Sequence, residues 1–224
     1  MPNVPTLSPT TIAISGSEQR FPVRRIYCVG RNYAEHVREM GNDLKDPPFF
    51  FSKPADAVVG SGARLAFPSR TADLHHEVEL VVALNQGGTN IAVAGSNATI
   101  FGYAVGIDLT RRDLQAEAKK AGRPWDMAKG FDHSAPIGAL QLGVPPAAAA
   151  ISLSVDGELR QNGNLKDMIW SVPEIIAALS TYVELAPGDL IFTGTPAGVG
   201  AIKRGQTVRG MIAGIEPIEI TFQE

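Results

Sequence analysis

The sequence contains a single cysteine, Cys28, among 224 residues. One thiol cannot form an intrachain disulfide, and neither a zinc-finger nor an iron–sulfur cluster can be assembled from the cysteines of this chain alone. This cysteine usage fits a reducing compartment. The first twenty residues are rich in Pro, Ser and Thr and lack the basic and apolar segments of a signal peptide. We therefore expect a cytoplasmic protein.

Long hydrophobic runs and an excess of one charge are also lacking. The apolar stretch at residues 78–84 is far shorter than the roughly 18 residues that a membrane-spanning helix needs. The formal net charge is -3, with acidic and basic residues mixed along the chain, so there is no electrostatic footprint for nucleic acid or an anionic membrane. These absences leave a small molecule as the expected partner.

What is present indicates a globular, strand-rich protein. The chain is 44% hydrophobic and 19% charged, which is typical of globular domains, and its length suffices for one well-cored domain. Short apolar runs separated by Gly, Pro and Asn favour strands. The predicted strands cover residues 25–29, 77–84, 102–107, 151–155, 189–192, 207–212 and 218–222. Residues 1–21 are predicted to form a polar N-terminal arm or a short edge element, and residues 22–224 a single domain.

Three helices and one tight turn are predicted from local signals. Thr110 and Asp113 resemble a capping box, which predicts a helix over residues 111–121. Ser171 followed by Glu174 predicts a second helix that runs to about residue 182. A third, short helix is expected over residues 34–40. The Asp156-Gly157 pair lies between two alternating runs and predicts a hairpin turn.

Glu77 and Glu79 are candidate metal ligands. Residues two apart on a strand point to the same face, so both carboxylates should enter one space. Two like charges there are costly unless a cation lies between them, and hard divalent cations prefer oxygen ligands. Asp108, at the end of the next predicted strand, could be a third ligand. A solvent-facing strand edge remains the alternative for the Glu-x-Glu pair alone. The neighbouring His75 and His76 are expected to support the site rather than bind the metal.

His36 and Glu39 are candidates for an acid–base pair. Their spacing of three places them on one face of the predicted short helix, where the carboxylate can orient the imidazole and raise its basicity. Such a pair could activate water. An exposed helix with ordinary charge pairing is the alternative interpretation.

Six blocks in collinear order resemble the fumarylacetoacetate hydrolase family, in the branch of fumarylpyruvate hydrolases and acylpyruvases. They are YCVGRNYAEHVREMG (27–41), FFFSKPADAVV (49–59), LHHEVELVVAL (74–84), GYAVGIDLTRRDLQ (102–115), GRPWDMAKGFDHSAPIG (122–138) and LIFTGTPAGVG (190–200). The resemblance implies an α+β, β-rich fold in which a mixed, rolled sheet surrounds the active site beside a few short helices. It also implies a homodimer and Mg²⁺ or Mn²⁺, with Ca²⁺ possible in crystals, on Glu77, Glu79 and Asp108.

The resemblance implies further site residues. His36 and Glu39 match a dyad on a mobile lid, and Lys129 matches the family's active-site lysine. The implied substrate-binding residues are Arg112, Gln115, Thr195, Arg31 and Lys53. A surface position is the alternative for Lys129, Arg112 and Gln115, and a structural role for Arg31 and Lys53. The glycines of residues 194–200 lack the lysine of a phosphate-binding loop and are interpreted as a turn that shapes the pocket.

The implied activity is cleavage of a carbon–carbon bond in an acylpyruvate, with fumarylpyruvate, cut to fumarate and pyruvate in aromatic catabolism, as the leading substrate. A 2-oxo acid is thus the expected small-molecule partner. Decarboxylation of oxaloacetate would pass through the same enolate, and isomerases or hydratases of 2-hydroxy-dienedioates are further alternatives. A metal-binding structural relative without activity is the alternative from a different class.

Overall fold

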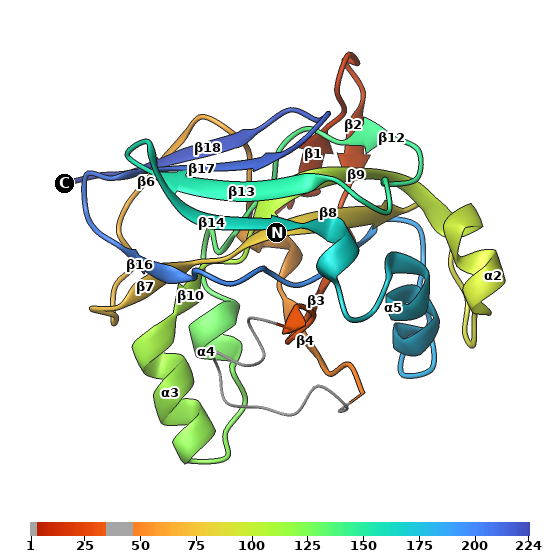
Figure 1. The fold of residues 1–224 in the computed structure, drawn as a ribbon, viewed down its shortest axis with the longest axis horizontal. Coiled ribbons are helices and arrows are strands. Elements are labelled where there is room, and N and C mark those ends of the chain that lie inside the picture. Colours follow the sequence, from red (N-terminus) through yellow and green to blue (C-terminus); the bar gives the residue numbers. More distant parts are fainter. Residues whose placement is uncertain (1–3, 35–46) are drawn as a thin grey trace.

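Two β-sheets form most of the structure, a computed structural model that describes residues 4–34 and 47–224 (Figure 1). The six-stranded sheet has the order β12 (Gln141–Leu142), β9 (Ile100–Ile107), β8 (Val78–Leu84), β15 (Asp189–Phe192), β3 (Arg25–Val29) and β4 (Phe50–Lys53). The five-stranded sheet has the order β14 (Glu158–Asn164), β13 (Ala150–Val155), β17 (Thr207–Ile212), β18 (Ile218–Phe222) and β6 (Ala63–Leu65). Each contains one parallel pair, β15 with β3 and β18 with β6, so both sheets are mixed. The predicted β-rich α+β fold is confirmed.

Smaller elements surround these sheets. Strands β10 (Thr110–Arg111), β7 (Leu74–His76) and β16 (Gly200–Ile202) form a three-stranded sheet. Strand β11 (Ala135–Pro136) pairs with β5 (Val58–Val59), and β1 (Thr11–Ala13) pairs with β2 (Arg20–Pro22). The helices are α2 (Val93–Ser96), α3 (Arg112–Lys120), α4 (Asp126–Lys129) and α5 (Val172–Leu179), with short 3₁₀ turns at Ala55–Ala57, Asn97–Thr99 and Leu165–Asp167. Within the described residues, none of these helices is long and apolar enough to cross a membrane.

Strand β8 is buried on both faces, which explains why it is a continuous apolar run. Val78, Leu80 and Val82 belong to the hydrophobic cluster that includes the inner side chains of the five-stranded sheet. Val81 and Ala83 belong to a second cluster on the opposite face. The two carboxylates that precede and interrupt this run, Glu77 and Glu79, share the parity of the second cluster. The strand therefore carries its acidic residues at one end of a fully buried face.

The N-terminal residues pack against that second cluster. Ile12 and Phe21, which are opposite each other in the β1–β2 hairpin, are both buried in it. Ile14 follows β1, pairs with Leu140 through an isolated bridge and is buried as well.

Most predicted strands are confirmed, with one informative correction. The strand expected over 77–84 begins at Val78, because Glu77 separates β7 from β8. At this residue the chain passes from the three-stranded sheet to the six-stranded one. The Asp108 amide still donates to the Glu77 carbonyl at 2.8 Å, so the pairing of β8 with β9 extends to these two acidic residues.

The helix predictions differ in detail. Helix α3 is confirmed, but Thr110 does not cap it: Thr110 lies in β10, and its hydroxyl contacts the Asp108 carbonyl and the Lys129 amine. The Ser171 and Glu174 capping interaction at α5 is confirmed, while the helix ends at Leu179 rather than near residue 182. The helix expected over 34–40 lies outside the described residues, except for its first position. At the predicted turn, Asp156 and Gly157 both have positive φ, as a two-residue hairpin loop requires.

Candidate active site

Three buried carboxylates converge at the end of the β8–β9 pair. Glu77, Glu79 and Asp108 each place a carboxylate oxygen within 4.8 Å of the others. Their exposed fractions are 6%, 1% and 1%. The sheet geometry causes this convergence, because Glu79 lies two residues beyond Glu77 on the same face and Asp108 lies opposite Glu77. Gly106 is paired with Glu79 and has no side chain to occupy the space.

Lys129, at the end of α4, is the central cation of the cluster. Its amine donates to Glu77 Oε2 at 2.8 Å, to Asp108 Oδ2 at 2.6 Å and to the Thr110 hydroxyl at 2.6 Å. Only 2% of the residue is exposed. Burial alone would lower the pKa of Lys129, but the adjacent Asp108 and Glu77 carboxylates outweigh it and raise the pKa. Lys129 is therefore an ammonium ion buried among the carboxylates.

Lys53, in β4, lies behind Asp108. Its amine is 2.7 Å from Asp108 Oδ1, an ion pair without hydrogen-bond geometry, and it donates to the carbonyls of Leu109 and Lys129. The side chain is completely buried and is not part of the pocket lining. The structure thus puts Lys53 in a supporting position, in contact with Asp108 and outside the pocket lining.

Helix α3 contributes the polar wall of the site. The Arg112 guanidinium donates to Glu77 Oε1 at 2.5 Å and to Gln115 Oε1 at 2.6 Å. The third contact of this guanidinium is His75 Nδ1, at 3.4 Å. Arg112 and Gln115 are three residues apart on one face of the helix, which explains why both point to the carboxylates.

The carboxyl of Glu79 has a strongly raised pKa. Burial raises its pKa well above the ordinary value, and the charges of Asp108 and Glu77 raise it further. The Gly194 amide, which donates to Glu79 Oε2 at 2.6 Å, favours the charged form. Gly194 has a φ of 96° and closely approaches Asn32, so only glycine fits this turn. The predicted role of the 194–200 glycines in shaping the pocket agrees with this contact.

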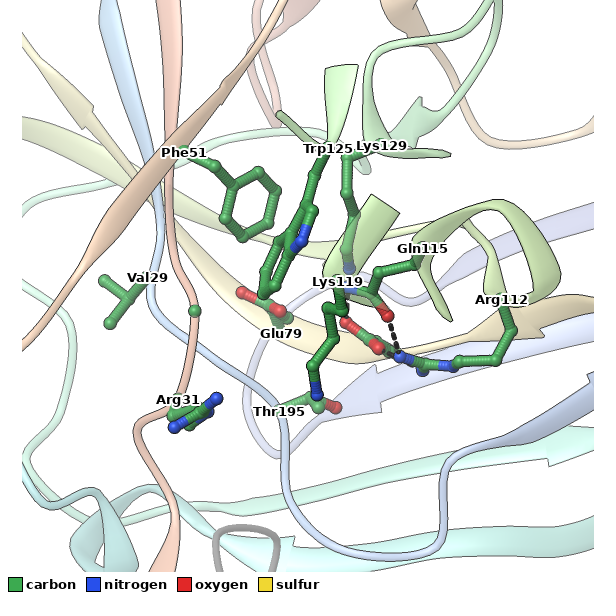
Figure 2. Close-up of a pocket in the computed structure, with 12 residues that line it drawn as sticks. Val29, Arg31, Phe51, Glu79, Arg112, Gln115, Lys119, Trp125, Lys129 and Thr195 are labelled. Carbon is green, nitrogen blue, oxygen red and sulfur yellow. Dashed lines mark hydrogen bonds and ion pairs between the residues drawn. The ribbon is translucent and has the colours of Figure 1, made fainter. Parts of the chain in front are cut away.

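A pocket open to solvent leads to these groups. Figure 2 shows Phe51 and Trp125 on one side, Arg112, Gln115 and Lys119 from α3, and Arg31 and Thr195 across from them. Lys119 and Trp125 were not predicted as site residues. Lys119 follows Gln115 by four residues on the same helix face, so the helical periodicity could have identified it. For Trp125, no signal in the sequence beyond its place in a motif pointed to the pocket.

The side chains of Thr195, His75 and His76 form hydrogen bonds with other groups of the protein. The Thr195 hydroxyl donates to the Val78 carbonyl at 2.8 Å and accepts from Gln161 at 2.8 Å. Gln161 also contacts His76 Nδ1 at 3.0 Å. Burial lowers the pKa of both His75 and His76 and keeps the imidazoles neutral at neutral pH. Neither belongs to the acidic cluster, in agreement with their predicted supporting role.

The structure therefore brings together most of the residues predicted as a site. Glu77, Glu79, Arg112, Gln115, Thr195, Arg31 and Lys129 line one pocket, and Asp108 and Lys53 lie directly behind it. His36 and Glu39 lie outside the described residues. The donor set of three carboxylates fits a hard divalent cation such as Mg²⁺ or Mn²⁺. Their present cationic neighbours, Lys129 and Arg112, show that this cluster needs positive charge.

Comparisons with known proteins agree with this site. The fumarylacetoacetate (FAA) hydrolase C-terminal family matches residues 25–223. The crystal structure of fumarylpyruvate hydrolase from Pseudomonas aeruginosa, in complex with Mn²⁺ and pyruvate, is 50% identical, with a TM-score of 0.96 and coverage of 98% of both chains. The fumarylpyruvate hydrolase of a Ralstonia species is 44% identical over 77% of this chain and 91% of its own. The mitochondrial oxaloacetate tautomerase of Mus musculus is also 44% identical, over 86% of this chain and 88% of its own. The chain belongs to the fumarylacetoacetate hydrolase family.

Proposed function

We propose that this protein is a divalent-metal-dependent hydrolase that cleaves fumarylpyruvate to fumarate and pyruvate. The observation that carries the proposal is the convergence of Glu77, Glu79 and Asp108 at the bottom of a pocket lined by cations. The relative from Pseudomonas aeruginosa, which binds Mn²⁺ and pyruvate, supports it. Mg²⁺ or Mn²⁺ would be held by the three carboxylates and would supply Lewis-acid polarisation of the 2-oxo acid end of the substrate.

The roles of the protein side chains follow from their chemistry. Arg112 and Gln115 bind the carboxylate and carbonyl oxygens at the 2-oxo acid end, since one offers a charged fork and the other an amide. His36, oriented by Glu39, takes a proton from water, and the resulting hydroxide attacks the carbonyl of the acyl group. The bond between the acyl carbon and the pyruvate methylene then breaks, and its electron pair forms the pyruvate enolate. Lys129 stabilises this developing negative charge, and protonation of the enolate gives pyruvate.

A second candidate is tautomerisation of oxaloacetate, favoured by the 44% identity to the Mus musculus oxaloacetate tautomerase. This reaction moves a proton between carbon and oxygen beside a polarised carbonyl and needs no water nucleophile. The same carboxylates and Lys129 could support it. Decarboxylation of oxaloacetate and isomerisation of 2-hydroxy-dienedioates remain further alternatives. The homodimer and the cytoplasmic location also stay predictions.

The test is turnover of metal-stripped protein after addition of Mg²⁺ or Mn²⁺, with fumarylpyruvate, acetylpyruvate and oxaloacetate assayed in parallel. For oxaloacetate, enol–keto exchange and CO₂ release are followed separately. The hydrolase proposal expects fumarylpyruvate to be cleaved fastest, and Glu77→Ala and His36→Ala to abolish cleavage. If only oxaloacetate reacts, and His36→Ala retains that activity, the hydrolase and its water-activating dyad are wrong.

A further inference from the structure

Lys119 is a cation at the outer end of the pocket wall. It lies in α3 seven residues beyond Arg112 and four beyond Gln115, so the three side chains form one row along the helix. Seven residues of an α-helix span about 10 Å, so the backbone of Lys119 lies about 10 Å from that of Arg112 along the helix axis, and Lys119 is exposed where the three carboxylates are buried. Figure 2 shows its amine extending into the pocket toward Thr195.

Arg31 is a second cation at this outer level. It follows β3 and lies across the pocket from α3 (Figure 2), with its guanidinium 5.3 Å from the centre of the Phe49 ring. Over residues 4–34 and 47–224, neither Arg31 nor Lys119 forms an ion pair. Lys129, Lys53 and Arg112 differ in this respect, since each faces a carboxylate of the cluster. Among the described residues, no carboxylate thus neutralises the positive charges of Arg31 and Lys119.

The pocket between the two levels has an apolar side. Phe51 and Trp125 both line it, with their rings 5.9 Å apart in an edge-on arrangement. A flat, unsaturated acyl chain fits against such aromatic side chains. From its inner to its outer end, the pocket therefore presents the carboxylate cluster with its cations, then an aromatic surface, and then two cations without an ion-pair partner among the described residues.

We propose that Lys119, with Arg31 opposite it, binds the distal carboxylate of the substrate and so selects acylpyruvates whose acyl group ends in a carboxylate. The inference rests on the proposed function, in which the 2-oxo acid end of the substrate lies at Glu77, Glu79 and Asp108. An extended substrate anchored there directs its other end toward the outer cations.

The first experiment compares kcat/KM for fumarylpyruvate and acetylpyruvate in the wild type, Lys119→Met, Lys119→Arg and the control Lys120→Met. Lys120 is the next residue of the same helix, is exposed and does not line the pocket. Loss of one charged contact is expected to lower the fumarylpyruvate to acetylpyruvate ratio about tenfold in Lys119→Met, mainly through KM. Lys119→Arg should keep most of the preference, and Lys120→Met all of it. An equal ratio in the wild type and Lys119→Met would overturn the inference.

The second experiment measures binding without turnover. Calorimetry of the Mg²⁺-loaded protein compares 2-oxoheptanedioate with 2-oxoheptanoate, two ligands of equal length that differ only in a distal carboxylate or methyl group. The wild type should prefer the dicarboxylate, and Lys119→Met should lose that preference. If Lys119→Met loses the preference but the protein cleaves no acylpyruvate, the proposed hydrolase activity is wrong and the role of Lys119 is supported. If the protein cleaves fumarylpyruvate but Lys119→Met keeps the preference, the hydrolase activity is supported and the role of Lys119 is wrong.

Discussion

Replacing Lys53 with methionine should destabilise the metal-free protein by about 3 kcal/mol, because it removes one partner of a fully buried ion pair. The Lys53 side chain is 0% exposed and that of Asp108 is 1% exposed. The substitution keeps an unbranched apolar stem but removes the amine, which leaves Asp108 Oδ1 without its cation and two carbonyls without their donor. Breaking a buried pair costs about 3–5 kcal/mol, and the lower end applies here because Lys129 still contacts Asp108 Oδ2.

The assay is chemical denaturation of stripped protein, followed by the same measurement with saturating Mg²⁺. A loss of about 3 kcal/mol corresponds to a fall in Tm of roughly 6–12 °C for a chain of this size. With Mg²⁺ the loss should shrink, since a bound cation supplies positive charge to the same Asp108 carboxylate. Lys203→Met, at an exposed position, is the matched control and should change stability by less than about 0.5 kcal/mol.

Two results would refute this reasoning. If Lys53→Met unfolds at the same denaturant concentration as the wild type without metal, the buried pair contributes no stability. If the loss is the same with and without Mg²⁺, then Asp108 does not share its charge with a metal, and its assignment as a ligand fails.

Three further predictions concern the ligands, the turn beside them and a helix cap. Mg²⁺ at a hundred times its Kd should stabilise the wild type by about 2.7 kcal/mol, and Glu79→Ala should lose this metal-dependent rise in Tm. Gly194→Ala would place a Cβ 2.6 Å from the Cβ of Asn32 at a φ of 96°, and the resulting shift of the turn should lower both stability, by about 1–3 kcal/mol, and metal affinity. Ser171→Ala should cost about 1 kcal/mol at pH 7, and Glu174→Gln should remove a pH-dependent part of the stability.

The sign of that pH dependence follows from the cap. The hydrogen bonds from the Ser171 hydroxyl and amide lower the pKa of Glu174 below its value in the unfolded chain. The contribution to stability is therefore complete above the unfolded pKa of about 4.3 and is lost as the pH falls through the lower, folded pKa. Denaturation curves between pH 7 and pH 3 should show wild type and Glu174→Gln converging at the acidic end. A stability difference between wild type and Glu174→Gln that stays constant with pH would contradict the prediction for the cap. The prediction for the ligands fails if Mg²⁺ raises the Tm of Glu79→Ala as much as that of the wild type. The prediction for the turn fails if Gly194→Ala is as stable as the wild type.

The strands and the carboxylates could be predicted because both depend on local periodicity. A period of two put Glu77 and Glu79 on one face whatever surrounded them, and the end of the next strand put Asp108 close by. The break of the strand at Glu77 could not be predicted, since the change of sheet depends on pairing with β10 and β16 from distant parts of the sequence. Strand β14 was missed for a related reason: it lies at the edge of its sheet, its first three residues are exposed, and Leu159 is its one apolar side chain apart from glycine, so it has no apolar run.

The capping signal at Thr110 failed for a different physical reason. A threonine hydroxyl can satisfy a helix amide, but here it accepts from the buried Lys129 ammonium, which needs partners more than an exposed helix end does. Asp113, the other half of the expected motif, accepts instead from the Thr71 hydroxyl and the Ala72 amide. The demands of a buried charge therefore override a local preference whose strength is about 1 kcal/mol.

The lysines that neutralise the carboxylates could not be predicted from local sequence either. Lys53 and Lys129 come from β4 and α4, and neither has a periodic relation in sequence to the carboxylates that it neutralises. A buried anion must find positive charge, but nothing local specifies which residue supplies it. The row Arg112, Gln115 and Lys119 is the exception, because one helix face fixes all three positions. Arg112 contacts Glu77 at the inner end of this row, and Lys119 occupies its exposed end, seven residues farther along α3 and still in the lining of the same pocket.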